Sequence, residues 1–381
     1  MKLCIFANDP LQAYFEKGEI KKRYFNPENF FDEIHFISFI EKDIEIAKIQ
    51  KIGGTARVIV HSVGKISIRK RKKSLNSILE LVKKIEPDII RSYNPLLEGW
   101  FAANCAKKLN LPFFISLHTQ YDHNRKIAKK NNLKKFLALK YTEKFIEPFV
   151  LKNADKITAV YKIIIPYVEK HSTTNVEILH NKVDCNRFQT ATKIDNILQP
   201  MILSVGNLIP VKNHSVLIKA IKNIDVNLMI IGNGEQYQEL MDLIKNLNLE
   251  NKVTIKKSVP NDQIQNYYKS AKIFALAYNP ELEALPIPVI EAMATGLPTI
   301  IPHPKEGFSE GLEGIAIFSK NDEKSFEKNI KTILNNKNLQ EEISKKSLQK
   351  SKEFDESKIE AREAQIYAEL IKKRKNNEGI D

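Results

Sequence analysis

Two glutamates, Glu283 and Glu291, stand eight positions apart in the stretch NPELEALPIPVIEAMATGLPTI (279–300). Glu283 precedes a proline-punctuated apolar run, and Glu291 lies inside a short helical pattern. A carboxylate at such a helix start is repelled by a phosphate, but it can accept two hydrogen bonds from a diol, as acidic residues do for ribose in dinucleotide folds. The alternative is that Glu291 only complements the helix dipole, an effect of about 0.3–1 kcal/mol.

The elements around the two glutamates predict where they lie. The run 272–278 predicts a strand, which leaves Glu283 on the loop at the carboxyl edge of a sheet. A helix is predicted over 288–294 with Gly296 as its stop, so Glu291 falls in its first turn. Prolines donate no N–H, so the backbone donors that can meet an anion or a sugar hydroxyl there are those of Ala284, Leu285, Ile287 and Val289.

A lysine at the entrance of another predicted helix indicates a diphosphate site. In SVGNLIPVKNHSVLIKAI (204–221) a strand ends at Gly206, and Lys212 precedes a helix that starts near Asn213. Exposed helix N–H groups and a lysine together attract a diphosphate, although Lys212 is equally explained as a solvated loop residue. In IIGNGEQYQEL, Gly232 either lets a ligand approach the backbone or only serves a tight turn.

Strand-like apolar runs alternate with helical stretches along the whole chain. Strands are predicted at 2–7, 33–40, 56–63, 88–93, 113–118 and 156–161, and then at 201–208, 226–234, 253–259, 272–278 and 298–303. Helices are predicted between them, for example at 74–85, 96–109 and 124–149. This alternation is typical of parallel sheets covered on both faces. We predict an α/β chain of two doubly wound, Rossmann-like domains whose ligand sites face each other across a cleft.

A polar stretch, 178–200, separates the two series of strands and ends in a proline, so it has the composition of a linker. We place one domain at 1–190 and a second at 191–355. The charged helical segment 356–381 is expected to pack back near the first domain.

Several segments together resemble one enzyme family. EALPIPVIEAMATGLPTI (283–300) resembles the E-x7-E signature of retaining GT-B glycosyltransferases, specifically glycosyltransferase family four. ILSVGNLIPVKN resembles the glycine–strand–lysine segment of that family, and ILHNKVDCNRF resembles its interdomain segment with Lys182 in place of glycine. IIGNGE and VPNDQIQNYYKSAKIFALAY stand in the expected places. The resemblance covers residues 200–303 closely and the amino-terminal half more loosely.

The resemblance implies a transferase that takes a sugar from a UDP- or GDP-sugar, retains its anomeric configuration, and needs neither metal nor cofactor. Lys212 would neutralise the diphosphate leaving group, Glu291 would hold the ribose hydroxyls, and Glu283 would face the transferred sugar. The implied catalytic residues are His118, Lys212 and Glu283. The implied donor-binding residues are Gly18, Gly206, Asn207, Lys212, Gly232, Glu283, Ala284, Leu285, Ile287 and Glu291.

Two departures from the family pattern concern the donor site. Asn207 stands where an arginine is usual, which removes one positive charge beside the leaving group. Ala284, Leu285 and Pro286 stand where glycines are frequent. These departures keep open an alternative, a catalytically inactive GT-B binding protein that docks on anionic surfaces.

The amino-terminal half is expected to bind the acceptor, a glycan or a glycolipid. FFISLHTQYDHNRK ends a predicted strand at His118, where the family places a histidine near the donor sugar; a structural hydrogen-bonding role is the alternative. The long connection 11–33 contains Gly18 and the basic residues Lys21, Lys22 and Arg23, and we assign it to the acceptor mouth.

The formal net charge of +14, from 60 Lys and Arg against 46 Asp and Glu, indicates an anionic partner. KISIRKRKK (65–73) has six basic residues among nine, and the segment 125–144 has eight with a single acid. Within the second segment and just beyond it, an apolar residue recurs every four positions: Leu133, Leu137, Tyr141, Phe145 and Phe149. This stripe either lies on an anionic membrane surface or faces the core. Nucleic acid is not expected, because we expect no exposed aromatics between the basic residues and find no known nucleic-acid module in the sequence.

The remaining composition bears on location. The sequence shows no secretory signal pattern and no apolar run near the ~18–20 residues that span a bilayer. Cys4, Cys105 and Cys185 are expected to be reduced core thiols. We expect a cytoplasmic protein, with peripheral attachment to the inner face of the membrane as an open possibility.

Overall fold

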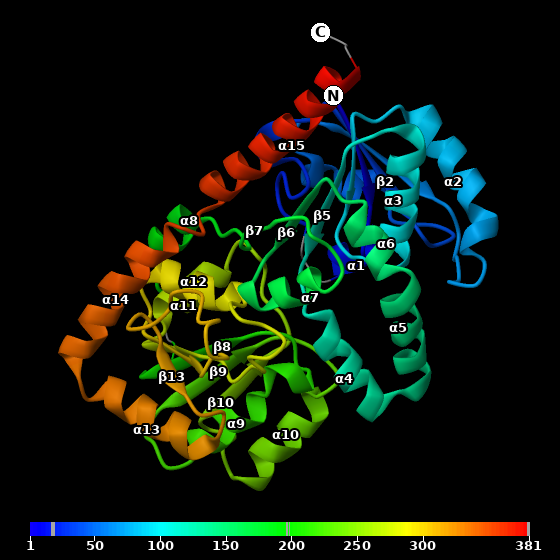
Figure 1. Ribbon diagram of the computed structural model, residues 1–381. Coiled ribbons are helices and arrows are strands. Elements are labelled where there is room, and N and C mark those ends of the chain that lie inside the picture. Colours follow the sequence, from blue (N-terminus) through cyan, green and yellow to red (C-terminus); the bar gives the residue numbers. More distant parts are fainter. Residues whose placement is uncertain (17–19, 196, 198, 379–381) are drawn as a thin grey trace. The chain divides into compact units, whose positions relative to one another are not determined.

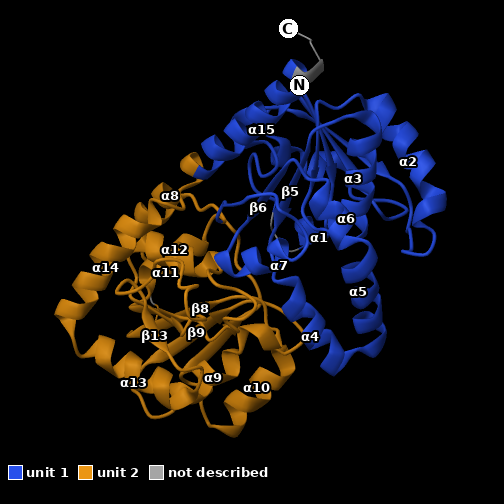
Figure 2. Ribbon diagram, viewed as in Figure 1, with its two compact units in different colours: residues 1–180, 359–381 blue, residues 181–358 orange. Residues whose placement is uncertain are grey.

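The computed structural model describes residues 1–16, 20–195, 197 and 199–378, and the chain divides into two compact units (Figures 1 and 2). Unit 1 comprises residues 1–180 and 359–381, and unit 2 comprises residues 181–358. Residues 181–190, which the sequence placed in the first domain, belong to unit 2. There the N–H of Val183 donates to the carbonyl of Phe354 at 3.0 Å, and Cys185 Sγ donates to the carbonyl of Ser351 at 3.3 Å.

Unit 1 is built on a seven-stranded sheet with the order β3-β2-β1-β4-β5-β6-β7, and all its strand pairs are parallel. The strands are Lys2–Phe6 (β1), Glu33–Ser38 (β2), Arg57–Ser62 (β3), Ile89–Ser92 (β4), Phe113–Leu117 (β5), Lys156–Ala159 (β6) and Val176–Ile178 (β7). The helices are Leu11–Glu16 (α1), Arg71–Ile85 (α2), Leu97–Leu109 (α3), Tyr121–Asn131 (α4), Leu133–Phe145 (α5), Glu147–Lys152 (α6) and Ile165–Glu169 (α7). The chain runs outward from β1 to β3 and then returns to β4 on the other side of β1, which is the doubly wound order.

The sheet of unit 1 is covered on both of its faces. Successive strand residues point to opposite sides, and apolar side chains pack against both. Leu3 and Ile5 belong to one core cluster with Tyr367 of the last helix, Glu356–Glu378 (α15). Phe6 points the other way, to Phe39 at a ring distance of 6.4 Å, and Phe39 lies 5.4 Å from Phe101 of α3. Two-sided burial explains why these strands are apolar almost throughout.

A buried arginine joins α15 to this sheet. Arg91 on β4 donates to the hydroxyl of Tyr367 at 2.7 Å and forms an ion pair with Glu363 at 2.9 Å. Its guanidinium also lies 4.0 Å from the centroid of the Phe114 ring. The carboxyl-terminal helix therefore completes the core of unit 1 from Ile359 onward.

Unit 2 contains a six-stranded parallel sheet with the order β10-β9-β8-β11-β12-β13. The strands are Met201–Val205 (β8), Asn227–Ile231 (β9), Val253–Lys256 (β10), Ile273–Ala275 (β11), Thr299–Pro302 (β12) and Ile317–Ser319 (β13). The helices are Cys185–Gln189 (α8), His214–Ala220 (α9), Tyr237–Asn246 (α10), Ile264–Ser270 (α11), Ile287–Thr295 (α12), Glu323–Leu334 (α13) and Lys337–Ser351 (α14). The prediction of two α/β units with parallel sheets is confirmed.

The sequence missed two short strands and two helix breaks. β7 and β13 have only three residues each, too few to show a period. The helix predicted over 124–149 is wrong as one element, because it divides into α4, α5 and α6. Asn132 caps α5 by accepting the N–H of Lys135 at 2.9 Å, and Pro148 stands at the start of α6.

The structure also bears on the cysteines and on the length of the apolar helices. Cys4, Cys105 and Cys185 are free and buried, as predicted. Among the helices that the described residues form, none combines the length and the apolar character needed to cross a bilayer.

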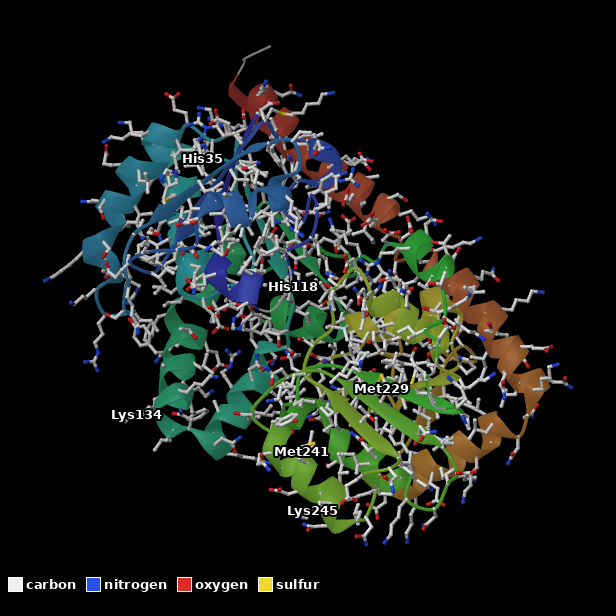
Figure 3. The ribbon with its side chains drawn as sticks, turned by 180° about the vertical axis from the view of Figure 1, so that it is seen from behind. His35, His118, Lys134, Met229, Met241 and Lys245 are labelled. Carbon is white, nitrogen blue, oxygen red and sulfur yellow. The ribbon has the colours of Figure 1, made fainter. Side chains whose placement is uncertain are left out.

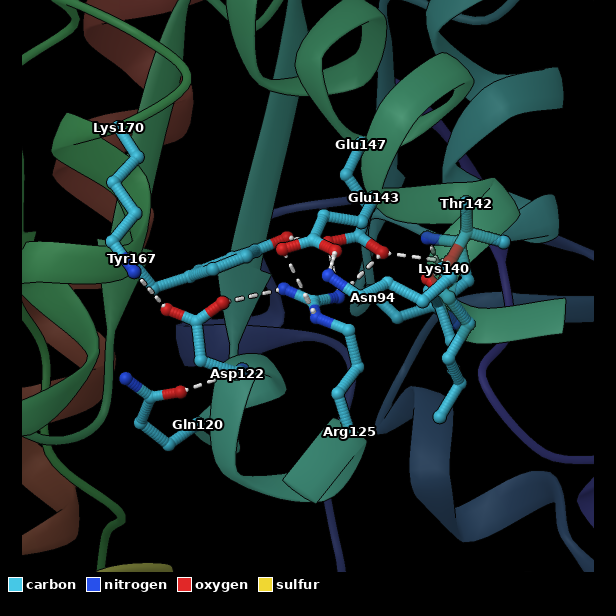
Figure 4. A network of polar contacts seen from close by, with 12 residues as sticks. Asn94, Gln120, Asp122, Arg125, Lys140, Thr142, Glu143, Glu147, Tyr167 and Lys170 are labelled. Carbon is cyan, nitrogen blue, oxygen red and sulfur yellow. Dashed lines mark hydrogen bonds and ion pairs between the residues drawn. The ribbon is translucent and has the colours of Figure 1, made fainter. Parts of the chain in front are cut away.

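A buried carboxylate holds the three helices from α4 to α6 together (Figure 4). Glu147 is fully buried and accepts hydrogen bonds from Arg125 at 2.9 Å, Thr142 at 2.7 Å and the hydroxyl of Tyr167 at 2.6 Å. Arg125 also pairs with Asp122 at 2.7 Å. A buried charge is tolerated only when it is paired and hydrogen-bonded, and this one has donors from α4, α5 and α7.

Glu147→Ala should destabilise the protein strongly, because it leaves the buried guanidinium of Arg125 without its main partner. We expect the free energy of unfolding to fall by roughly 3–5 kcal/mol in urea titrations. Lys170→Ala is the matched control, since it removes only an exposed partner of Asp122 and should change the free energy by less than about 1 kcal/mol. Equal effects of the two substitutions would contradict the role of Glu147.

A buried histidine should make unit 2 sensitive to acid. His214 opens α9, is fully buried, and contacts the hydroxyl of Ser204 at 3.2 Å. Burial, and then the charge of Lys212, lower the pKa of His214 from 6.5 to about 4. Between these values the unfolded chain binds a proton that the folded chain does not, so stability is lost as the pH falls.

We expect this histidine to contribute a loss of about 1.6 kcal/mol between pH 6.5 and pH 5. His214→Gln should flatten the dependence of the unfolding free energy on pH by that amount. Other histidines titrate in both proteins, so the difference between wild type and variant isolates His214. Parallel pH profiles would show that His214 does not control the acid response.

Candidate functional site

Three loops of unit 2 meet at the carboxyl edge of its sheet, where β8, β9 and β11 end. The N–H of Leu208 donates to the carbonyl of Asn233 at 2.9 Å, which ties the first loop to the second. The N–H of Asn279 donates to the carbonyl of Val211 at 2.8 Å, which ties the third loop to the first. Most of the predicted donor-site residues lie on these loops.

Two of the predicted catalytic residues form an ion pair here. Lys212 Nζ donates to Glu283 Oε2 at 2.5 Å, although 71 positions separate the two residues. Lys212 is buried and its stem packs over Gly206, where an added Cβ would lie 3.4 Å from the lysine Cδ. Glu283 is half-buried. The ion pair and the packing over Gly206 therefore fix the position of the lysine ammonium group at this edge of the sheet.

The glycines of this edge have a structural explanation. A Cβ on Gly232 would lie 1.9 Å from the carbonyl oxygen of Gly206, and one on Gly234 would lie 2.4 Å from that of Leu208. Real contacts are never so short, so the two loops can approach only because both positions are glycine. Close packing of backbone is sufficient to require Gly232, and a ligand contact by this residue stays a prediction.

Glu291 lies deeper than the sequence indicated. It is the fifth residue of α12, so its predicted place in the first turn is wrong. Its side chain is buried, and its Oε2 accepts the hydroxyl of Tyr268 on α11 at 2.8 Å. Glu283 and Glu291 thus have different partners, a lysine and a tyrosine.

Tyr268 was missed by sequence reasoning. Its ring lies 5.5 Å from that of Phe188 and 5.7 Å from that of Phe274. Burial, and then the charge of Glu291, raise the pKa of Tyr268 well above its ordinary value, so its hydroxyl stays a donor. Two adjacent tyrosines occur in the segment, and no pattern in the sequence distinguishes the one that meets the glutamate.

The start of α12 offers backbone donors. Within the part of the chain that the structure describes, we find no hydrogen-bond acceptor for the N–H groups of Ala284, Leu285 and Ile287. The N–H of Val289, in contrast, donates to the carbonyl of Pro286 at 2.9 Å, so the prediction that it is available is wrong. The side chains of Ala284 and Leu285 are buried, which leaves only their backbone to meet a ligand.

The remaining predicted donor residues divide into two cases. Asn207 is exposed on the loop after β8, and its carbonyl accepts the N–H of Ile209 at 2.9 Å. Gly18 lies outside the described residues. In the same long connection of unit 1, Arg23 forms an ion pair with Glu360 of α15 at 3.2 Å, which gives that basic residue a structural partner.

His118 belongs to unit 1, where it follows β5 directly (Figure 3). Its ring lies 5.7 Å from that of Tyr93, and the residue keeps an exposed surface. Desolvation, and then the charge of Arg91, lower the pKa of His118 to about 4. The ordinary pKa of histidine is also below 7, so the ring is neutral at pH 7 even where solvent reaches it. A neutral imidazole can accept or donate a hydrogen bond to a sugar hydroxyl.

Among the described residues, no group of three or more histidine, cysteine, aspartate or glutamate side chains lies close enough together to hold a metal ion.

Comparisons with known proteins cover both halves of the chain. Residues 41–187 match the family model described as Glycosyltransferase Family 4, and residues 191–350 match the model described as Glycosyl transferases group 1. An uncharacterized glycosyltransferase of Haemophilus influenzae is 28% identical over 317 residues, which cover 80% of this chain and 83% of the relative.

Two further matches concern a named activity and a solved fold. The N-acetylgalactosamine-N,N'-diacetylbacillosaminyl-diphospho-undecaprenol 4-alpha-N-acetylgalactosaminyltransferase of Campylobacter jejuni is 32% identical over 203 residues, 51% of this chain and 54% of the relative. The crystal structure of HepE from Anabaena in complex with UDP-glucose superposes with a TM-score of 0.72 at 15% identity, over 97% of this chain and 100% of that one. Because the two models match one unit each and the solved structure shares the fold, the chain belongs to glycosyltransferase family four as a GT-B glycosyltransferase.

Proposed function

We propose that the protein transfers a sugar from a UDP- or GDP-sugar to a lipid-linked or other glycan acceptor, with the donor held by unit 2 and the acceptor by unit 1. The observation that carries the proposal is the ion pair of Lys212 and Glu283 at the carboxyl edge of the unit 2 sheet. The Campylobacter relative is named for a diphospho-undecaprenol acceptor, and HepE was crystallised with UDP-glucose, which supports this choice of substrates. The match to enzymes favours this function over the inactive binding protein.

In the proposed donor site, each group has a distinct task. Lys212 faces the diphosphate and offsets the negative charge that grows on it as the sugar leaves. The backbone N–H groups of Ala284, Leu285 and Ile287 add donors at the start of α12. Glu291 has one oxygen held by Tyr268, and its other oxygen is available for a ribose hydroxyl.

Glu283 has two tasks in this scheme. It pairs with Lys212 in the absence of donor. Once the donor is bound and Lys212 pairs with the diphosphate, Glu283 faces the transferred sugar. Because the lysine is already buried and oriented, its charge requires little rearrangement when the donor binds. Asn207 leaves the diphosphate with one positive charge fewer than is usual in the family, so Lys212 should carry a large share of the stabilisation.

We further propose that the transfer retains the anomeric configuration and needs no metal. The acceptor hydroxyl attacks the anomeric carbon on the face from which the nucleotide departs. The bond from that carbon to the diphosphate oxygen breaks, and the hydroxyl proton passes to the departing phosphate. His118 would hold a hydroxyl of the sugar during this step.

The product of an α-linked donor should therefore be α-linked. Proton NMR of the product, with the coupling of its anomeric proton, measures this directly. Activity should persist after treatment with EDTA. A β-linked product, or loss of activity that a divalent cation restores, would contradict the corresponding part of the mechanism.

Nucleotide binding tests the site residues. In a thermal-shift panel of UDP, GDP, ADP and CMP with their sugar conjugates, one diphosphate should stabilise the wild type by about 2.7 kcal/mol at a hundred times its Kd. Lys212→Met should weaken the binding of that diphosphate by roughly tenfold or more, because the variant lacks the positive charge that faces the phosphates. The affinity for the free nucleoside should stay unchanged. Glu291→Gln should weaken both, because the ribose is common to them.

Matched controls exist on the same unit. Lys219→Met, at an exposed lysine of α9, and Glu239→Gln, at an exposed glutamate of α10, remove the same charges away from the site. A 2′-deoxy diphosphate should bind the wild type as weakly as the ribonucleotide binds Glu291→Gln. Unchanged nucleotide binding in both site variants, with unchanged stability, would refute the assignment.

A further inference from the structure

Helix α5 presents an apolar stripe to solvent. Leu133, Leu137, Tyr141 and Phe145 recur every four residues, and they expose 65%, 59%, 38% and 53% of their surface, respectively. We call these four residues the α5 stripe. The opposite side of the helix, with Thr142 buried, contacts α4 and α6. Of the two alternatives from the sequence, the core-facing one is therefore wrong for these four residues, whereas Phe149 lies on α6 and is half-buried.

The hairpin of α4 and α5 is held firmly from inside unit 1. Thr142 of α5 and Arg125 of α4 both donate to the buried carboxylate of Glu147 (Figure 4). Large exposed apolar residues on a rigidly anchored helix are not explained by packing. A contiguous apolar patch rimmed by polar residues marks an interaction surface.

Basic residues surround the stripe. Lys134, Lys140 and Lys144 lie beside it at helical spacing, and Lys144 Nζ lies 5.3 Å from the centroid of the Phe145 ring. The second basic segment, 65–73, reaches the same place, because Arg71 Nη2 donates to the hydroxyl of Tyr141 at 2.9 Å. Its neighbours Arg69, Lys70, Lys72 and Lys73 are exposed. The fold thus joins two basic segments that are separate in the sequence.

These two segments carry nearly all of the net charge. Residues 65–73 and 125–144 together contain fourteen Lys and Arg and one acidic residue, a net of +13 out of +14 for the whole chain. The rest of the chain has 46 basic and 45 acidic residues and is close to neutral. The net charge of the chain is therefore concentrated in these two segments.

We propose that the α5 stripe and its basic border dock on a lipid bilayer with anionic headgroups. The apolar side chains enter the boundary between headgroups and acyl chains, and the lysines remain at the level of the negative charges. Each Lys or Arg near such a surface strengthens binding by about fivefold. This inference rests on the proposed function in one respect, which is that docking would give the enzyme access to a lipid-linked acceptor.

Vesicle sedimentation with the full chain tests the proposal. The wild type should bind vesicles that contain phosphatidylglycerol, should bind pure phosphatidylcholine weakly, and should be released by high salt. The variant L133Q/L137Q/F145Q should bind the anionic vesicles at least about tenfold more weakly. These residues are exposed, so the variant should keep the wild-type melting temperature.

The matched control is M241Q/K245Q on α10, which alters an exposed apolar residue and an exposed lysine of unit 2 (Figure 3). It should bind vesicles like the wild type. Stabilisation by nucleoside diphosphate should be unchanged in both variants, so a failure of the donor site and a failure of docking give different results.

Three outcomes would overturn the proposal. The first is a wild type that does not sediment with anionic vesicles, and the second is equal binding by the stripe variant and the α10 control. The third outcome concerns a second copy of the chain as the occupant. If analytical ultracentrifugation shows that the wild type is a dimer and the stripe variant a monomer, and the variant still binds vesicles, then the stripe is a contact between copies.

Discussion

The parallel arrangement of strands is the constraint on which the site depends. Parallel strands end at one edge of their sheet, so loops that are far apart in sequence are brought together there. Lys212 follows β8 and Glu283 follows β11, and these strands are neighbours in the sheet. The ion pair at 2.5 Å is a direct consequence of that strand order. The glycines on the loops after β8 and β9 serve the same end, because a side chain at Gly232 would push the two loops apart.

The buried charged residues of the two units differ in how many partners they have. Glu147 and Arg91 in unit 1 hold helices against each other and against the sheet, and each has several partners. Glu291 in unit 2 is also buried, but a single tyrosine bonds its side chain and leaves one oxygen without a protein donor among the described residues. An oxygen that no protein group bonds can accept a hydroxyl of a ligand, so this difference agrees with the proposed ligand role of Glu291.

In helix α5, tertiary packing decides which apolar residues are covered and which are exposed. The helix carries apolar residues on two faces, and only one of them is covered by α4 and α6. The other face meets solvent beside basic residues of the two segments that hold almost the whole net charge of the chain. In the proposed function, the surface for lipid and the site for the donor then lie on different units.

Much of the architecture was predictable from the sequence. The apolar runs were long enough and regular enough to predict eleven strands and the two parallel sheets, and the segments around Glu283 and Lys212 indicated the enzyme family. The three-residue strands β7 and β13 were missed because so short a segment has no period. Asn132 and Pro148 signal the breaks that divide the helix 124–149, but a continuous apolar spacing across them concealed the division.

Side-chain partners and exposure were decided only by the tertiary structure. Spacing placed Glu291 near the start of a helix, yet its burial and its bond to Tyr268 depend on how α11 packs against α12. The same holds for the α5 stripe, whose spacing is the same whether it faces the core or the solvent. Local pattern determines which elements form, since it acts through the backbone and neighbouring side chains. Which face of an element is covered depends on residues far away in the sequence, and no local pattern records them.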